Sequence, residues 1–259
     1  EEFFEVKITD LHRATLDKLK KDGWERIPDV LDAWFESGSM PFAYKHYPFE
    51  NKEEVENIKY KSDYIVEGQD QTRGWFYTLM VLSTALFDRE AFKTISANGH
   101  LVDENKKKLS KSLGNYSDPI KILDTYGADS TRLYLLGSNF LKAEPVPIDK
   151  EGKFIYETTK TILSPLWSAY HFFSLYANAS NITAKIDSES EDLLDKYILE
   201  ELNLLEEIVH DSISNYKPDV AIREFVKFLD ILNNWYIRRN RERFWNEDIK
   251  AFNVLYKVL

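Results

Sequence analysis

The sequence predicts an α/β domain built on a parallel sheet, followed by an all-α helical bundle. Short stretches of alternating apolar residues at 62–67 and 92–97 each lead into a polar turn, and a helical pattern lies between them. Strand, turn, helix and strand form the repeating unit of parallel sheets. From about residue 154 the apolar residues take the 3.6-residue period of helices instead. We therefore expect an α/β domain over residues 1–150 and a helical domain over residues 151–259.

The composition is that of a globular chain. Its 259 residues are 43% hydrophobic, and they include 16 Phe, 15 Tyr and 6 Trp. The formal net charge of −10 argues against nucleic-acid binding through overall positive charge, so any such contact needs local basic patches. Without cysteine there can be no thiolate metal site, and the histidines lack ligand spacing, so no protein-bound metal is expected. No apolar run is long enough to span a membrane, and a cytoplasmic location is expected.

The two ends of the chain suggest a piece of a longer protein. Residues 1–8 alternate like a strand already in progress and lack an initiator methionine, while residues 252–259 keep an apolar helical pattern without a stop signal. Further in, Trp34 and Phe35 stand before a Ser-Gly-Ser-Met-Pro segment at residues 37–41. We expect this segment to be a turn, and the aromatic pair either to line a small apolar pocket or to pack in the core.

The first predicted strand, at residues 62–67, leads into a polar turn. A helical pattern follows from residue 76 to residue 86. Ligands of parallel sheets bind beyond the carboxyl ends of the strands. In this turn Glu67, Asp70 and Gln71 could hold ribose hydroxyls or an ammonium group. The alternative is structural, with the aspartate capping the helix and the glutamate held by a partner.

The second predicted strand ends at Asn98-Gly99-His100, ahead of a lysine-rich loop. This lysine loop, residues 105–115, reads N-K-K-K-L-S-K-S-L-G-N. Small residues allow the backbone to approach a ligand, and lysine is a flexible point charge suited to phosphate. The loop could therefore hold a polyphosphate and stabilise the charge of a transition state, although a solvated turn is the alternative.

Helices dominate the remainder of the sequence. Asp118-Pro119 opens one helix, and Asp129 is expected to cap the next. Three further helices follow, with a kink expected at Pro165 and a polar linker at residues 177–191. The third ends in N-W-Y-I-R-R-N-R-E-R-F-W, residues 234–245. Its arginines could bind phosphates and its aromatic rings could stack on bases, or the stretch could be a solvated helix end.

Several of these segments resemble class I aminoacyl-tRNA synthetases. Lys108-Leu109-Ser110-Lys111-Ser112 is similar to the Lys-Met-Ser-Lys-Ser signature of that family, and leucine keeps the volume and polarity of methionine. The run E-G-Q-D-Q-T-R-G-W-F, residues 67–76, resembles the loop that holds the aminoacyl-adenylate in isoleucyl-tRNA synthetases. The segments at residues 34–41, 126–136 and 234–245 resemble further parts of these enzymes in the same order, so the resemblance covers nearly the whole chain.

The resemblance implies the second half of a Rossmann-like nucleotide-binding domain and the start of an anticodon-binding bundle. It implies an ATP-dependent ligase that joins isoleucine to tRNA(Ile) through isoleucyl-adenylate, with Mg²⁺-bound ATP as a substrate, and we expect a monomer with no membrane partner. By motif position the catalytic residues are Lys108 and Lys111, with Lys111 the more important. The residues that would hold ATP or the adenylate are Glu67, Gly68, Asp70, Gln71, His100, Ser110 and Ser112. Trp34 and Trp75 would line the amino-acid pocket. The residues that would bind tRNA are Arg238, Arg239, Arg241 and Arg243.

Two features of the family are absent from this sequence. No His-x-Gly-His signature occurs, and the editing insertion is missing apart from its possible exit strand at the start of the chain. We therefore expect the 259 residues alone neither to form adenylate nor to edit. Two alternatives remain. A valyl-type synthetase piece is disfavoured by the Glu-Ser-Gly-Ser sequence after Trp34-Phe35, and a non-catalytic tRNA-binding module is disfavoured by the presence of both ligand loops.

Overall fold

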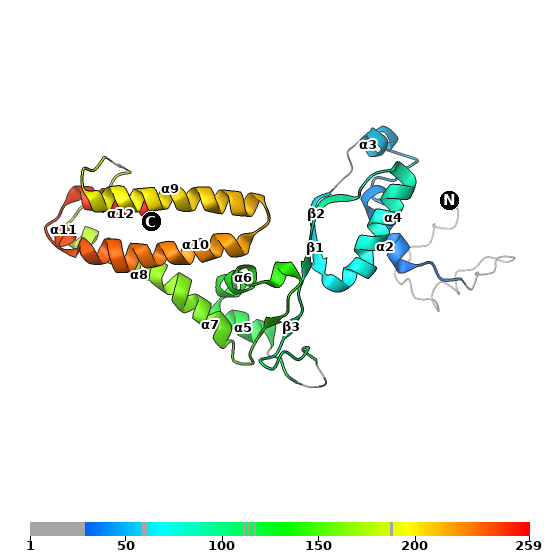
Figure 1. Ribbon diagram of the computed structural model, residues 1–259, viewed down its shortest axis with the longest axis horizontal. Coiled ribbons are helices and arrows are strands. Elements are labelled where there is room, and N and C mark those ends of the chain that lie inside the picture. The colour runs from blue at the N-terminus through cyan, green and yellow to red at the C-terminus, as the bar shows by residue number, and fades with distance from the viewer. Residues whose placement is uncertain (1–28, 58–61, 111, 113, 117, 187–188) are drawn as a thin grey trace, which may run out of the picture. The chain divides into compact units, whose positions relative to one another are not determined.

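The computed structural model describes residues 29–57, 62–110, 112, 114–116, 118–186 and 189–259 (Figure 1). They fall into two compact units, one with described residues 29–57 and 73–91 and the other with residues 62–72 and 92–259. The strand expected at residues 1–8 lies outside the described residues.

The described residues of the smaller unit form three helices: α2 (Ala33–Ala43), α3 (Lys52–Asn57) and α4 (Trp75–Phe87). The turn expected at residues 37–41 is wrong, because these residues belong to α2 and Pro41 lies inside the helix. Asp32 caps α2 by accepting a hydrogen bond from the Trp34 amide (2.8 Å). Gly38 is buried against α4, where an added Cβ would lie 2.8 Å from Thr78 Oγ1. The cap and this packing outweigh the weak helix propensity of serine, glycine and proline.

The larger unit contains the parallel strands that the sequence predicts. β1 (Ser62–Gly68) pairs in parallel with β2 (Phe92–Asn98), so that Gly68 lies opposite Asn98. η3 (Gln69–Arg73), a 3-10 turn, continues directly from β1. β3 (Leu101–Val102) and β4 (Val146–Pro147) form a second parallel pair. The carboxyl ends of β1 and β2 therefore lie at one edge, where ligands of such sheets bind.

Two helices follow the lysine loop. Asp118 caps α5 (Pro119–Tyr126) by accepting from the Ile120 amide (2.9 Å), as the sequence predicts. The prediction for α6 (Ala128–Gly137) is wrong, because its cap is Gly127 and Asp129 lies in the first turn, where it pairs with Arg132. Gly127 has a φ of +83°, a conformation that favours glycine over a side-chain cap. The short turn η4 (Phe140–Lys142) leads on to β4.

The remaining helices form the bundle. Their order is α7 (Lys153–Thr158), the π-helical turn η5 (Thr159–Leu163), α8 (Ser164–Ala179), α9 (Leu193–Ser214), α10 (Pro218–Asp230), the π-helical turn η6 (Ile231–Ile237), α11 (Arg241–Trp245) and α12 (Ile249–Val258). The long helices α9 and α10 run side by side (Figure 1). The π-helical turn η5 lies just ahead of Pro165, where the sequence predicts a kink.

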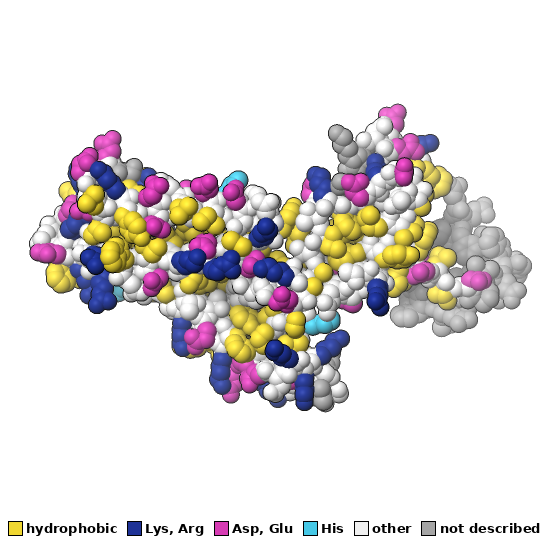
Figure 2. Space-filling view, in the orientation of Figure 1, with side chains coloured by type: hydrophobic (Ala, Val, Ile, Leu, Met, Phe, Trp, Pro, Cys, Tyr) yellow, Lys and Arg dark blue, Asp and Glu magenta, His cyan; other side chains and the backbone are white. Residues whose placement is uncertain are grey.

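The bundle core is aromatic and aliphatic, and its centre excludes solvent. The side chains at its heart are no more than 5% exposed: Ile198, Phe228, Leu232, Tyr236, Phe244 and Phe252. Figure 2 shows acidic and basic side chains interspersed over the bundle surface. Within the larger unit, an ion pair from Lys142 to Asp219 (2.6 Å) and a stack of Tyr64 on Tyr216 join the sheet region to the bundle. Among the helices the structure describes, none has the length and apolarity needed to cross a membrane.

Candidate functional site

The end of β1 gathers the acidic turn that the sequence singles out. Glu67 is exposed at the end of the strand, and Asp70 and Gln71 lie in η3 immediately after it. A Cβ added to Gly68 would lie 2.6 Å from Asp70 Oδ1, so Asp70 folds back over the glycine backbone. Gln71 Nε2 donates to Asp70 Oδ2 (3.0 Å). The turn thus presents two carboxylates and an amide beyond the carboxyl end of a parallel strand.

The end of β2 adds His100 and one residue that the sequence reasoning missed. Asn98 lies opposite Gly68, and its Oδ1 is buried without a hydrogen-bond partner in the described part of the chain. A buried acceptor without a partner is costly in free energy, so it marks a place where a ligand donor would be favourable. The only signal for Asn98 in the sequence is its place at the end of a predicted strand.

Gly99 fixes the path of the chain between Asn98 and His100. A Cβ at this position would lie 1.7 Å from the carbonyl oxygen of Glu144, and the Gly99 amide donates to Phe140 O (2.7 Å). The carbonyl of His100 then accepts from the Val146 amide (2.9 Å), which begins the pairing of β3 with β4. No residue with a side chain fits at 99 without moving the backbone that carries Asn98 and His100.

The lysine loop leaves β3 and turns back onto it. Lys108 forms an antiparallel bridge with Val102, and Ser110 Oγ lies 2.8 Å from Ser112 Oγ. The side chains of Lys106, Lys107 and Lys108 are exposed, and none forms an ion pair in the part of the chain that the structure describes. Lys111, the other predicted catalytic lysine, lies outside the described residues. The described lysines are therefore free to meet an anionic ligand.

Two polar side chains at the base of the lysine loop also escaped the sequence reasoning. Asp103 accepts from backbone amides of the loop and from Asn115, and Asn115 accepts in turn from the Ser110 amide. The hydrogen bond from Asn115, followed by those from the backbone, lowers the pKa of Asp103 below its ordinary value. Asp103 is therefore a carboxylate at neutral pH, placed among lysines.

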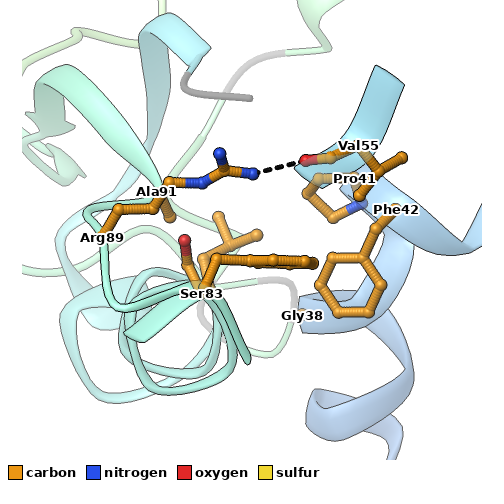
Figure 3. A pocket seen from close by; sticks show the side chains of 9 residues that line it. Gly38, Pro41, Phe42, Val55, Ser83, Arg89 and Ala91 are labelled. Carbon is orange, nitrogen blue, oxygen red and sulfur yellow. Dashed lines mark hydrogen bonds between the residues drawn. The ribbon is translucent and has the colours of Figure 1, made fainter. Parts of the chain in front are cut away.

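The two predicted pocket tryptophans lie in the smaller unit. Trp34 is 45% exposed, and the indole nitrogen of Trp75 donates to Ser37 O (3.0 Å), which ties α4 to α2. A small, mainly apolar pocket in this unit has Phe42 and Ser83 in its wall (Figure 3). Arg89 closes one side of it, where its Nη2 donates to Val55 O (2.7 Å). Neither tryptophan is among the described residues that line this pocket.

Three of the four predicted tRNA-binding arginines are exposed. Arg238 and Arg241 have solvent-exposed side chains. Arg239 is also exposed, and its guanidinium lies 3.8 Å from the ring centroid of Trp235, a cation–π contact that holds both side chains at the surface. Trp235, Arg238, Arg239 and Arg241 are thus exposed basic and aromatic side chains in the last turn of η6 and just after it.

Arg243 differs from its prediction, because its guanidinium is engaged within the protein. It donates to both carboxylate oxygens of Asp195 (2.8 Å each) and to Asp248 Oδ2 (2.8 Å). Burial alone would raise the pKa of Asp195, but hydrogen bonds from Arg243, Ser190 and Tyr236 outweigh it and lower that pKa. Arg243 thus joins α9, α11 and the cap of α12. Its main partner is 48 positions away in sequence, so no local pattern could reveal it.

No three His, Asp or Glu side chains within the described ranges come together in a way that could hold a metal ion.

Two family models match the chain. The model described as tRNA synthetases class I (I, L, M and V) matches residues 2–146, and the model described as the anticodon-binding domain of tRNA ligase matches residues 195–259.

Curated relatives match over the whole chain. An isoleucine–tRNA ligase of Rickettsia akari (strain Hartford) is 46% identical over 273 aligned residues, which cover 100% of this chain and 25% of the relative. Isoleucine–tRNA ligases of Rickettsia peacockii (strain Rustic) and Rickettsia canadensis (strain McKiel) match at 45% and 46% with the same coverage. The chain thus spans about a quarter of the length of these relatives.

Solved structures share the fold. The LeuRS of Agrobacterium radiobacter K84, in a ternary complex with tRNA and LeuAMS, has a TM-score of 0.66 and 18% identity over 90% of this chain and 29% of its own. Mycobacterium tuberculosis methionyl-tRNA synthetase in complex with methionyl-adenylate has a TM-score of 0.69 and 19% identity over 87% of this chain and 44% of its own.

Proposed function

The chain belongs to the class I tRNA synthetases of the I, L, M and V group, and from this premise we propose that it is part of an isoleucine–tRNA ligase. The isoleucine assignment is supported by the relatives that share 45–46% of its residues over its full length. The structural observation that carries the proposal is the sheet edge. There the acidic turn of β1 lies beside the end of β2, and the chain continues from β2 into the exposed lysine loop.

In the first proposed step, an isoleucine carboxylate oxygen attacks the α-phosphorus of ATP and pyrophosphate leaves. Mg²⁺ enters with ATP as part of the substrate. The ammonium groups of Lys108 and Lys111 would neutralise charge on the pentavalent phosphorus and on the leaving pyrophosphate, with no covalent enzyme intermediate. The hydroxyls of Ser110 and Ser112, 2.8 Å apart, offer further hydrogen bonds to phosphate oxygens.

The remaining groups at this edge suit the rest of the adenylate. The carboxylates of Glu67 and Asp70 can accept from ribose hydroxyls or from the isoleucine ammonium group. The Oδ1 of Asn98, which has no partner among the described residues, would accept from a donor of the nucleotide, and His100 follows it at the same edge. Trp34 and Trp75 would contribute to an apolar pocket for the isoleucine side chain. Such a pocket separates aliphatic chains that differ by one methylene by only about 1–3 kcal/mol.

In the second proposed step, a ribose hydroxyl at the 3′ end of tRNA(Ile) attacks the carbonyl carbon of isoleucyl-adenylate, which forms the isoleucyl ester and releases AMP. Arg238, Arg239 and Arg241 would contact the phosphates of this tRNA, with Trp235 available for stacking. Arg243 is left out of this surface because internal carboxylates engage it. We also propose the division at residue 150 into a catalytic part and an anticodon-binding part, a monomeric state and a cytoplasmic location.

Amino-acid-dependent exchange of pyrophosphate into ATP tests the proposal in a full-length synthetase that carries this sequence. We expect isoleucine to support exchange better than valine, and Lys108→Ala to lower kcat by about 10²–10³-fold through lost transition-state stabilisation. Lys121→Ala, which removes an exposed lysine from α5, is the matched control and should stay within about twofold. Preference for valine would favour the valyl alternative, and no exchange with any amino acid would favour a tRNA-binding module.

A further inference from the structure

We propose that Asp103 and Asn115 are positioning residues for adenylate formation, because together they fix the backbone of the lysine loop from which Lys108 acts. This inference rests on the proposed function. Neither side chain needs to touch ATP, since both act through the backbone of the loop between them.

Asp103 holds the first half of the loop. Its Oδ1 accepts from the amides of Asn105 and Lys107 (2.9 Å each), and its Oδ2 accepts from Asn115 Nδ2 (3.0 Å). Its own amide donates to Lys107 O (2.8 Å). Lys106 is forced to a φ of +60° between these bonds, a conformation that a lysine rarely adopts unless its surroundings impose it.

Asn115 holds the second half from the other end. Its Oδ1 accepts from the Ser110 amide (2.9 Å), and its Nδ2 also approaches Lys108 O (3.3 Å). The Gly114 amide donates to Ser110 O (3.1 Å) just before it. One carboxylate and one amide, hydrogen-bonded to each other, thus bind backbone groups on both sides of Lys108.

The sheet carries this arrangement. Val102 bridges Lys108 on one side, while its carbonyl accepts from the Ile148 amide (2.7 Å) on the other, next to β4. The backbone of Lys108 is therefore attached to the sheet through Val102 and to the loop ends through Asp103 and Asn115. Because three lysines in a row repel one another, the ionised Asp103 at their base also offsets part of that repulsion.

Reaction rates respond steeply to such positioning. A displacement of about 1 Å in a catalytic group can lower a rate by about 10²-fold. If the Asp103–Asn115 pair were only a structural turn, breaking it would lower the stability of the protein and leave kcat unchanged. If the pair positions Lys108, breaking it should lower kcat.

The test exchanges the two side chains in the full-length synthetase. Asp103→Asn sets two amide groups face to face, and Asn115→Asp sets two carboxylates face to face, so each single variant breaks the 3.0 Å hydrogen bond. In the double variant the new amide at position 103 can donate to the new carboxylate at position 115 and still accept from the two loop amides. The carboxylate at position 115 can still accept from the Ser110 amide, and only the longer approach to Lys108 O disappears.

We expect each single variant to lower kcat for isoleucine-dependent pyrophosphate exchange by about tenfold or more. KM for isoleucine should stay within about twofold, and the double variant should return kcat to within about threefold of the parent. Glu104→Gln is the control, since it removes the neighbouring charge from a side chain that makes no hydrogen bond to the loop among the described residues.

Trypsin cleavage at the lysines of the loop provides a readout that does not depend on activity. Faster cleavage in both single variants, and parental cleavage in the double variant, would show that the pair orders the loop. Faster cleavage with unchanged kcat would make the pair a structural turn and overturn the inference, as would a double variant no better than the singles. If the parent protein exchanges with no amino acid, the proposed function fails and takes this inference with it; an active parent with unaffected single variants overturns this inference alone.

Discussion

At the scale of single residues, Asp195 is a buried charge that is held by several donors. Its carboxylate is fully buried and accepts from Ser190 (2.7 Å), Tyr236 (2.8 Å) and both terminal nitrogens of Arg243. The phenol of Tyr236 is itself buried, and burial together with Asp195 raises its pKa, so it stays a donor across the physiological range. Hydrogen bonds from these donors to both carboxylate oxygens therefore offset the free-energy cost of removing the carboxylate from water.

Asp195→Asn should destabilise the protein by about 3 kcal/mol at pH 7, because it breaks an ion pair on its buried side and leaves the partly buried Arg243 without its main counter-charge. The folded pKa of Asp195 lies below its unfolded value of about 3.9, so the carboxylate stabilises the fold above that pH and loses this effect as the pH falls through the folded pKa. The difference between parent and variant should accordingly shrink below about pH 4.

Urea unfolding followed by circular dichroism at pH 7 and pH 3 measures this difference. Asp129→Asn is the control, since it removes an exposed carboxylate paired with Arg132 and should change stability by less than about 0.5 kcal/mol. A pH-independent gap between parent and Asp195→Asn would contradict the assigned role of the charge.

At the scale of elements, the period of the apolar residues correctly predicted the helices and strands whose positions depend on local sequence. β1, α4, β2, α5, α9 and α10 all lie where alternation or helical spacing placed them. The failures share a different cause. The extent of α2 depends on Gly38 packing against α4, and the role of Arg243 depends on Asp195 in a distant helix. Contacts of that kind arise only after elements pack, so no window of sequence contains them.

The candidate site shows the same division. Its motif residues are identifiable from the sequence because their order is characteristic. Asp103, Asn115 and Asn98 are not, because a loop aspartate or asparagine looks alike whether it faces water or binds backbone amides. Asp103 and Asn115 are distinguished by their hydrogen bonds to backbone amides, and Asn98 by a buried oxygen without a partner among the described residues. Both features exist only in the folded chain.

Gly99→Ala tests the element that carries Asn98 and His100. Its Cβ would meet the backbone of Glu144 at 1.7 Å, and backbone cannot move aside as a flexible side chain can. We expect a loss of about 3 kcal/mol in unfolding free energy, at the upper end of overpacking effects. Gly137→Ala is the matched control: its Cβ meets only the Ile222 side chain at 3.1 Å, and alanine favours the helix there. Thermal unfolding of both variants measures this loss. Equal unfolding midpoints for Gly99→Ala and Gly137→Ala would show that the close approach at Gly99 is not needed for stability.

At the scale of the whole molecule, the proposed function requires a chain of net charge −10 to meet an anionic tRNA through a restricted area. We propose that Trp235, Arg238, Arg239 and Arg241, whose side chains are exposed, provide this area. Binding through few phosphates has a defined signature, because each neutralised phosphate releases counterions.

Removing Arg238, Arg239 or Arg241 singly should weaken tRNA binding and reduce the slope of log affinity against log salt by about 1 for each phosphate that is no longer neutralised. Arg132→Ala, which removes an exposed arginine from α6, should leave the slope unchanged. Filter binding over a range of salt concentrations measures both. Slopes that stay parental in all three variants would place the tRNA elsewhere on the protein.

The wide turn η6 has a further consequence for how this region tolerates change. Helical side chains advance by about 100° per residue, so a residue gained or lost within residues 231–237 would rotate everything beyond it by that angle. An insertion ahead of Tyr236 would move Arg239 into the buried place of Asn240, and a deletion there would move Arg238 into the buried place of Ile237. In both cases Tyr236 would lose its hydrogen bond to Asp195. An insertion or deletion would therefore put the basic surface and the buried tyrosine out of phase together.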